Sequence, residues 1–144
     1  MGRFLLPGTR EPETPEPLPV MQTTVERTGL TAAVAPVTIF TAGRAGFYRA
    51  TIVAFCTTGG DAITLTVNII HTDRTSGSSV TRPVIGTASD PAVAALSMSA
   101  TGRTSGTYTF EAAANTNVQY SSTLSGARAA SVHAYKIFIE RLED

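Results

Sequence analysis

Few side chains in this sequence have the types and spacing that catalysis or metal binding requires. The chain has two histidines, His71 and His133, and one cysteine, Cys56. His71 and Asp73 are two residues apart, so on a strand both side chains would lie on one face. Two protein ligands without a third make a weak metal site. The favoured interpretation places His71 at the end of a strand beside a polar loop, with no metal bound.

His133 and Cys56 form no recognisable pair of nucleophile and base. His133 alternates with Ser131 and Tyr135, which indicates a surface or interface side chain on a strand. No feature near Cys56 marks a base, so we interpret it as a small, semi-apolar side chain that packs in a hairpin. A single cysteine also excludes an intrachain disulfide.

The acidic and glycine-rich segments also lack the context that chemistry needs. Asp61, Asp73, Asp90 and Glu111 fall near predicted turns or strand ends and form no pair of carboxylates. The glycine-rich segments lack the strand-to-helix setting of phosphate-binding loops. We therefore expect no catalytic residue, no metal and no cofactor, and we expect that the protein is not an enzyme.

Composition limits the classes of partner. A chain of 144 residues is long enough for one domain with one hydrophobic core. Eleven basic and eleven acidic residues cancel, so the chain lacks the field that attracts nucleic acid, and low net charge favours self-association. No apolar run is long enough for a membrane span or a signal peptide. We expect no nucleic acid, no membrane, and folding in a reducing cytosol.

Residues 1–22 are predicted to form an extended N-terminal arm. Five of the eight prolines lie between residues 3 and 21, interleaved with glutamates. Such a segment cannot build a core, and it is either a disordered tail or an arm laid across neighbouring subunits. Apolar clusters at both ends of the proline stretch favour the arm. The predicted partner-binding residues are Arg3, Phe4, Leu5, Leu6, Arg10, Val20 and Met21.

Residues 23–144 are predicted to form one all-β domain. Short runs rich in Val, Ile, Thr, Tyr and Phe are separated by Gly, Ser, Asp and Asn. About eight strands at intervals of roughly ten residues predict an antiparallel β-sandwich or jelly roll. Residues 90–96 could instead form one short helix, because an Asp-Pro start precedes good helix formers. The predicted strands are 23–28 (an edge), 37–41, 47–57, 62–73, 80–85, 92–99, 107–112, 117–124 and 130–142.

Three of these strands carry more specific predictions. Apolar residues alternate with polar ones from Ile63 to Ile69, and the preceding Gly-Gly-Asp turn predicts a hairpin over residues 55–69. Pro83 predicts an edge strand. The last strand is apolar on both faces, which would follow if one face packs the core and the other meets a sister subunit. Its competing sets are Tyr135, Ile137 and Ile139 against Val132, Ala134, Phe138 and Leu142.

Several of these runs resemble small virion proteins of tailed bacteriophages. The runs are Gly-Phe-Tyr-Arg-Ala at 46–50, Ile-Thr-Leu-Thr-Val at 63–67, Asn-Val-Gln-Tyr-Ser-Ser-Thr at 117–123 and the aliphatic ending at 135–142. The likeness covers roughly residues 23–142, and the proline-rich arm departs from the shortest relatives. The resemblance implies a β-sandwich, often trimeric, that attaches to a capsid or tail without catalysis.

Three functions remain open after this comparison. The preferred one is a capsid decoration or cement protein on the virion surface, made in the bacterial cytoplasm. It would form a homotrimer and bind the major capsid protein or other virion subunits. The second is a tail or head-fibre adaptor. The third is a glycan-binding β-sandwich with Tyr108 and Tyr120 as platforms, which the lack of tryptophan disfavours.

Overall fold

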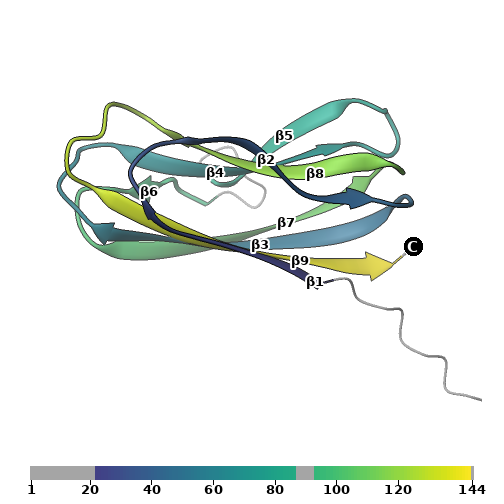
Figure 1. Cartoon of the computed structure of the whole chain (residues 1–144), viewed down its shortest axis with the longest axis horizontal. Helices are drawn as coiled ribbons and strands as arrows, with labels where there is room; N and C mark the ends of the chain where they lie inside the picture. Colours follow the sequence, from purple (N-terminus) through teal and green to yellow (C-terminus); the bar gives the residue numbers. More distant parts are fainter. Residues whose placement is uncertain (1–21, 87–92, 144) are drawn as a thin grey trace, which may run out of the picture.

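The structure is a computed structural model that describes residues 22–86 and 93–143. Over these residues the chain forms nine β-strands and no helix (Figure 1), so the all-β prediction is confirmed. No helix that could cross a membrane occurs in this part of the chain. The strands are β1 (Gln22–Leu30), β2 (Val34–Ala42), β3 (Gly46–Thr58), β4 (Thr64–Thr72), β5 (Ser79–Ile85), β6 (Leu96–Ser97), β7 (Gly102–Ala112), β8 (Thr116–Leu124) and β9 (Val132–Glu143).

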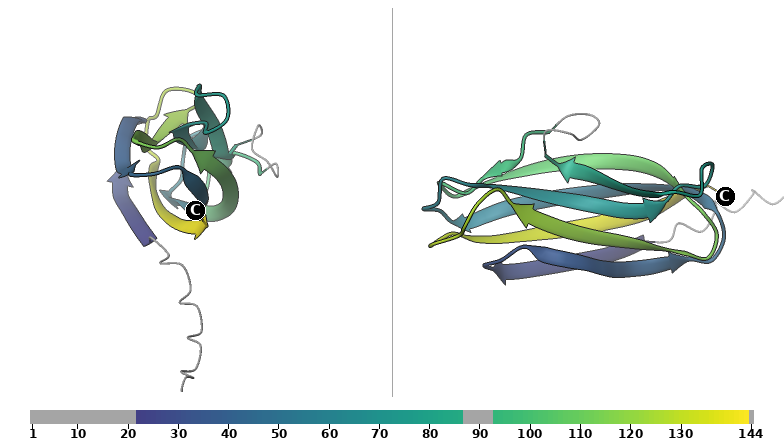
Figure 2. Two further views of the ribbon diagram at one scale, coloured as in Figure 1. Left: turned by 90° about the vertical axis from the view of Figure 1, so that its right-hand side faces the viewer. Right: turned by 90° about the horizontal axis from the view of Figure 1, so that it is seen from above.

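The strands form two antiparallel sheets that pack face to face (Figure 1). Sheet A has the order β1-β9-β3-β7, and sheet B has the order β2-β8-β4-β5, with β6 paired to β4. Most strands that are neighbours along the chain therefore lie in opposite sheets, as in a jelly roll. In the end-on view of Figure 2 the two layers enclose one core. The predicted sandwich or jelly roll is confirmed.

The core consists of the inward residues of both sheets, which alternate with outward residues because side chains on a strand have a period of two. On β3, every second residue from Tyr48 to Cys56 is buried. On β4, Leu65, Val67 and Ile69 are completely buried. Fully burying an aliphatic side chain of this size contributes about 1.5–3 kcal/mol, so these two strands supply much of the stability.

The last strand, β9, lies between β1 and β3, so both of its edges are paired. Tyr135, Ile137 and Ile139 are at most 1% exposed and pack in the core. Phe138 and Leu142 belong to the other set and face outward. The structure therefore decides which of the two apolar sets of this strand is internal.

The predicted hairpin over residues 55–69 is wrong. Both edges of β3 are occupied by β7 and β9, and β4 lies in the opposite sheet between β8 and β5. Residues 59–63 carry the chain across the core as an arch. An alternation with a period of two shows only that each strand buries one face. Two strands that lie opposite each other across a core show this alternation as clearly as the two neighbouring strands of a hairpin do.

The arch between β3 and β4 is fixed by the buried carboxylate of Asp61. It accepts hydrogen bonds of 2.8–3.2 Å from the amides of Ala129, Ala130 and Ser131, and a further one from the Ser131 hydroxyl. The Ser131 hydroxyl and amide make the largest contributions to holding the pKa of Asp61 well below its usual range. Through Asp61, the β3–β4 arch is joined to the connection between β8 and β9.

The predictions for the remaining segments are partly confirmed. The strand predicted over residues 92–99 is reduced to the two residues of β6, because only Leu96 and Ser97 pair with β4. Of the alternative helix, residues 93–95 are not helical and residues 90–92 lie outside the described residues. The two predicted edges, β1 and the Pro83-containing β5, are edge strands. The predicted arm lies outside the described residues except for Gln22, which begins β1.

Substitution of two glycines of β7 tests how closely the two sheets approach each other where β7 meets β5. A Cβ atom on Gly106 would collide with the Val84 carbonyl oxygen of β5, whereas one on Gly102 would meet nothing within 4 Å. We expect Gly106→Ala to lower the free energy of unfolding by about 1–3 kcal/mol, because β5 and β7 must move apart. Gly102→Ala is the matched control, with an expected change within about 0.5 kcal/mol. Urea denaturation followed by circular dichroism measures both, and equal stability of the two variants would contradict the close approach.

Candidate functional site

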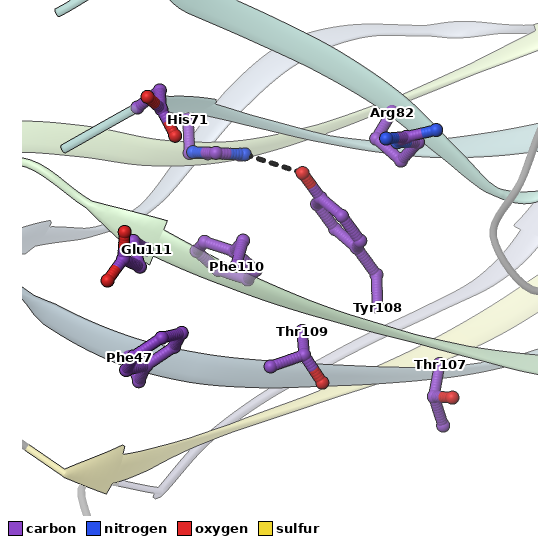
Figure 3. A pocket seen from close by; sticks show the side chains of 9 residues that line it. Phe47, His71, Arg82, Thr107, Tyr108, Thr109, Phe110 and Glu111 are labelled. Atoms are coloured by element: carbon purple, nitrogen blue, oxygen red, sulfur yellow. Dashed lines mark hydrogen bonds between the residues drawn. The ribbon is translucent and has the colours of Figure 1, made fainter. Parts of the chain in front are cut away.

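A polar hollow of about 440 Å³ opens where the edge strand β7 of sheet A meets β4 and β5 of sheet B (Figure 3). The side chains that give it chemical character are His71 from β4, Arg82 from β5, Tyr108 and Glu111 from β7, and Phe47 from β3. Figure 3 shows Tyr108 reaching from β7 toward His71 in the opposite sheet. The hollow is therefore built from strands of both sheets.

The wall of the hollow is held by a hydrogen bond of 2.8 Å between His71 Nε2 and the Tyr108 hydroxyl. His71 is 2% exposed, and burial lowers the pKa of its imidazole, so the ring is neutral at pH 7. Burial also raises the pKa of Tyr108, which keeps the phenol protonated. The Phe110 ring lies 4.6 Å from the His71 ring and 5.3 Å from the Tyr108 ring, between centroids. These contacts fix the Tyr108 side chain in one orientation.

The hollow carries charges of both signs. The Arg82 guanidinium lies 5.5 Å from the centroid of the Tyr108 ring, a cation–π contact. Asp73 and Glu111 supply two carboxylates, of which Asp73 already accepts hydrogen bonds from loop amides. Within residues 22–86 and 93–143, no three His, Cys, Asp or Glu side chains are grouped to hold a metal ion. The hollow therefore offers hydrogen-bond donors and acceptors to a polar ligand.

The second candidate surface is the outer face of sheet A, which is built mainly from β3 and β9. Phe138 and Leu142 of β9 are 43% and 38% exposed, and the half-buried Phe55 of β3 shares this face. Shallow grooves of about 320 and 190 Å³ lie along it, one beside Phe138 and one beside Phe55. Exposed apolar side chains that share one face are typical of a protein contact surface.

Two exposed ion pairs flank Phe138 on this face. Arg49 and Glu140 are 2.9 Å apart across β3 and β9, and Lys136 and Glu26 are 3.8 Å apart across β9 and β1. Exposed pairs of this kind contribute only about 0–1 kcal/mol to stability. Their arrangement around an apolar side chain resembles the polar rim of a protein interface.

The prediction that His133 is a surface or interface side chain is wrong. It is 1% exposed, and its ring stacks on Tyr135 with centroids 6.3 Å apart. Ser131, His133 and Tyr135 do alternate, but they belong to the inner set of the strand, and Ser131 is also buried. Burial lowers the pKa of His133, so its imidazole is neutral in the folded protein.

The remaining candidate residues lie either in the core or in the hollow. Cys56 is buried in the core, and its thiol donates a hydrogen bond to the Thr58 carbonyl at 3.3 Å. Burial raises the pKa of this thiol, which is typical of a structural rather than a reactive cysteine. Tyr120 is 3% exposed and is no platform, whereas Tyr108 is half-buried and lines the hollow. The structure brings His71 and Asp73 together in that hollow.

Some predicted residues lie outside the described part of the chain, and one residue of the hollow was not predicted from the sequence. The arm residues Arg3 to Leu6, Arg10, Val20 and Met21 lie outside the described residues. Arg82 and its place beside Tyr108 were not predicted, because strands that are distant in the sequence meet there. The sequence showed two apolar sets of side chains on β9, but the pattern did not show which set faces outward.

Neither a family model nor a curated protein matches the chain. Among solved structures it is similar to the VP2 subviral particle of infectious bursal disease virus, with 14% identity and a TM-score of 0.49 over 95% of this chain and 36% of that one. The Gx strain of that virus gives 10% identity and a TM-score of 0.48, over 84% and 32%. This chain thus spans about a third of the length of these virus proteins. Function has to be inferred from its own surfaces.

The two buried histidines predict a loss of stability in mild acid. Their folded-state pKa values lie below the unfolded value of about 6.5, so the unfolded chain binds more protons as the pH falls below about 6.5. Stability is full above that pH and declines below it, by at most about 1.4 kcal/mol per pH unit for each histidine.

Urea titrations between pH 7.5 and 5.5 measure this decline. The variant His133→Leu has one buried imidazole fewer and is expected to show a shallower slope than the unchanged protein. The matched surface variant Glu26→Gln is expected to keep the full slope. A flat profile for the unchanged protein would contradict neutral, buried histidines.

Proposed function

We propose that this protein is a non-enzymatic virion structural protein of the decoration or cement type. The observation that carries the proposal is the pair of exposed apolar side chains, Phe138 and Leu142, on the outward face of β9, a strand whose other face packs in the core. Large apolar side chains that are exposed on a paired strand are expected to be covered by another chain. The jelly-roll architecture, which viral capsid domains use among others, and the likeness of residues 23–142 to phage virion proteins support the virion setting.

The outer face of sheet A is assigned to contacts between sister copies in a homotrimer. Phe138 and Leu142 supply apolar area, and the two ion pairs beside them supply a polar rim. Burying a side chain of this size contributes about 1.5–3 kcal/mol. The zero net charge of the chain removes a barrier to bringing copies together.

The arm is assigned to contacts with the capsid. Ordering each of its residues costs about 1–2 kcal/mol of backbone entropy, which prolines reduce and which contacts with a partner must offset. The anchors are Phe4, Leu5, Leu6, Val20 and Met21, with Arg3 and Arg10 as charge partners. The arm joins the domain at Gln22, next to Thr23 and Thr24, which line the groove beside Phe138.

A clamp of this design opposes the separation of capsid subunits. A contact of about 1,000 Å² or more that crosses the boundary between two subunits must be broken before they part. Three arms on one trimer raise the effective concentration of each attachment, so individually modest contacts hold together. The partners are the major capsid protein or other virion subunits, and the site of action is the capsid surface.

The alternative is a tail or head-fibre adaptor, which would use the same arm and the same apolar face. The absence of a repeated shaft in the sequence favours the cement function. Labelled protein observed by negative-stain microscopy separates the two: label over the whole head supports cement, and label at one vertex or on the tail supports the adaptor.

Removing the arm is expected to abolish particle binding without unfolding the domain. A chain that lacks residues 1–21 keeps every described strand, so its thermal midpoint is expected to stay close to that of the full chain. Co-sedimentation with virions from which this protein has been removed measures binding. The full chain is expected in the pellet and the truncated chain in the supernatant, and undiminished binding of the truncated chain would refute the assigned role of the arm.

A charge on the outer face of sheet A is expected to dissociate the trimer. The full chain should sediment at three times the 15.0 kDa of one copy, and Phe138→Lys at the mass of one copy, because a lysine cannot be buried unpaired. Val37→Lys is the matched control, since Val37 is 38% exposed, close to the 43% of Phe138, but lies on β2 of the other sheet. Analytical ultracentrifugation decides, and a monomeric full chain at micromolar concentration would count against the trimer.

A further inference from the structure

We propose that the free edge of β1 pairs with β1 of a second copy of this chain, so that sheet A of one copy continues into sheet A of the other. Among the described strands β1 pairs with β9 alone, and Figure 2 shows it at the margin of the sandwich opposite β7. This contact goes beyond the assembly role, which uses the outer face of sheet A and the arm. The two proposals rest on different contacts.

Three of the four edge strands of the sandwich are protected against pairing with another chain. β2 and β5 contain Pro36 and Pro83, which lack an amide donor, and the ladders of both strands have register shifts. β7 is packed against the opposite sheet, because Gly106 lies against the Val84 carbonyl and Ala112 bridges to the loop between β4 and β5.

The fourth edge strand, β1, has none of these features in its regular part. From Gln22 to Arg27 it contains no proline, and its ladder with β9 has no register shift. Val25 is half-buried, although its neighbour on β9, Ile137, is completely buried, so the core is incompletely covered at this margin. An edge strand presents a row of N–H and C=O groups that another strand can pair with.

The strand that fits this edge best is β1 of a second copy. Of the described edges that a second copy offers, β1 is the one without proline and without packing against the opposite sheet. The arm fits less well, because prolines interrupt residues 12–19, next to β1 along the chain. A two-fold axis perpendicular to the sheet makes the pairing antiparallel and keeps the outward residues of both copies on one face.

The charges of β1 select the register of this pairing. A pair centred on Glu26 or on Arg27 would place two like charges directly opposite each other, which is destabilising. A pair centred on Val25 avoids this, because Val25 then meets Val25 of the other copy. Thr24 meets Glu26, and Thr23 meets Arg27. Residues 22–28 of the two copies are paired in this register.

The inward charge of Arg27 does not block the edge. A charged side chain that points inward from an edge strand can protect it against pairing. The Arg27 guanidinium, however, donates a hydrogen bond of 2.6 Å to the Tyr120 hydroxyl of β8 and lies 6.0 Å from the centroid of that ring. The side chain is therefore held across its own sandwich.

The contact is too small to hold two copies together in dilute solution. Residues 22–28 rise about 3.3 Å each, which gives a paired segment about 23 Å long and one strand wide. Such a contact buries less than the roughly 1,000 Å² of a stable complex. Where copies are already held side by side, their effective concentration lets it form. The edge pairing thus acts as a lateral link between neighbouring copies and leaves the mass at micromolar concentration unchanged.

The experiment traps the contact with engineered disulfides, since the one native cysteine, Cys56, is buried. The variants Thr24→Cys and Glu26→Cys change exposed residues whose Cβ atoms lie about 4.5–5.5 Å apart in this register. They are mixed in equal amounts at millimolar concentration and oxidised with copper phenanthroline, and mass spectrometry measures the crossed disulfide. We expect about tenfold more of it than from Thr24→Cys mixed with Thr28→Cys. Thr28 is the matched control, because it is also exposed on β1 but lies diagonally from Thr24 in this register.

Amide hydrogen exchange of the unchanged protein supplies a second measurement that needs no variant. Pairing protects every second amide of residues 22–28, because alternate N–H groups point away from β9. We expect these amides to exchange about threefold more slowly at millimolar than at micromolar concentration. The amides of β2 are expected to exchange at the same rate at both concentrations.

Three outcomes would overturn the proposal. They are no crossed disulfide between Thr24→Cys and Glu26→Cys, an equal yield from the mixture with Thr28→Cys, and exchange of the β1 amides that does not depend on concentration. The assembly role is tested separately. A protein that is monomeric at micromolar concentration and fails to bind virions, but gives the crossed disulfide and the slowed exchange, would refute that role and leave the edge pairing standing.

Discussion

The position of β9 at the centre of sheet A constrains the whole molecule. Because β1 and β3 occupy both of its edges, β9 cannot shift its register without breaking two ladders, and its two faces are fixed. The inner face supplies Tyr135, Ile137 and Ile139 to the core, and the alternation of the strand then forces Phe138 outward. The exposed apolar surface is thus a direct result of how the sheet is paired.

The polar groups inside the sandwich are placed where strands change sheets or meet across the core. Asp61 joins two connections at one end, and the hydrogen bond between His71 and Tyr108 joins β4 to β7. Each such group has to be paired or kept neutral, because an unpaired buried charge is costly. The negative charge of Asp61 is compensated by amides and a hydroxyl, whereas burial keeps the imidazoles of His71 and His133 uncharged.

Local alternation in the sequence predicted the strands well, since inward positions such as Leu65, Val67 and Ile69 have a period of two in any sandwich. The same alternation could not show which sheet a strand joins, and this is why the hairpin over residues 55–69 was wrong. It also could not show which set of the last strand is internal, and His133 was placed on the surface for that reason. Of the hollow, His71, Asp73 and Tyr108 were considered separately, but their meeting depends on contacts between distant strands that no local pattern contains.

The pairing of the first strand with the last has a consequence for biosynthesis. During translation β1, β2 and β3 leave the ribosome long before β9, yet both β1 and β3 need β9 as a neighbour. The nascent polypeptide therefore cannot close sheet A until β9, the final strand of the domain, has emerged, and the early strands wait with unpaired edges. Sequence-distant pairing of this kind slows folding, so newly made chains are exposed to premature association for longer than a helical protein of equal length.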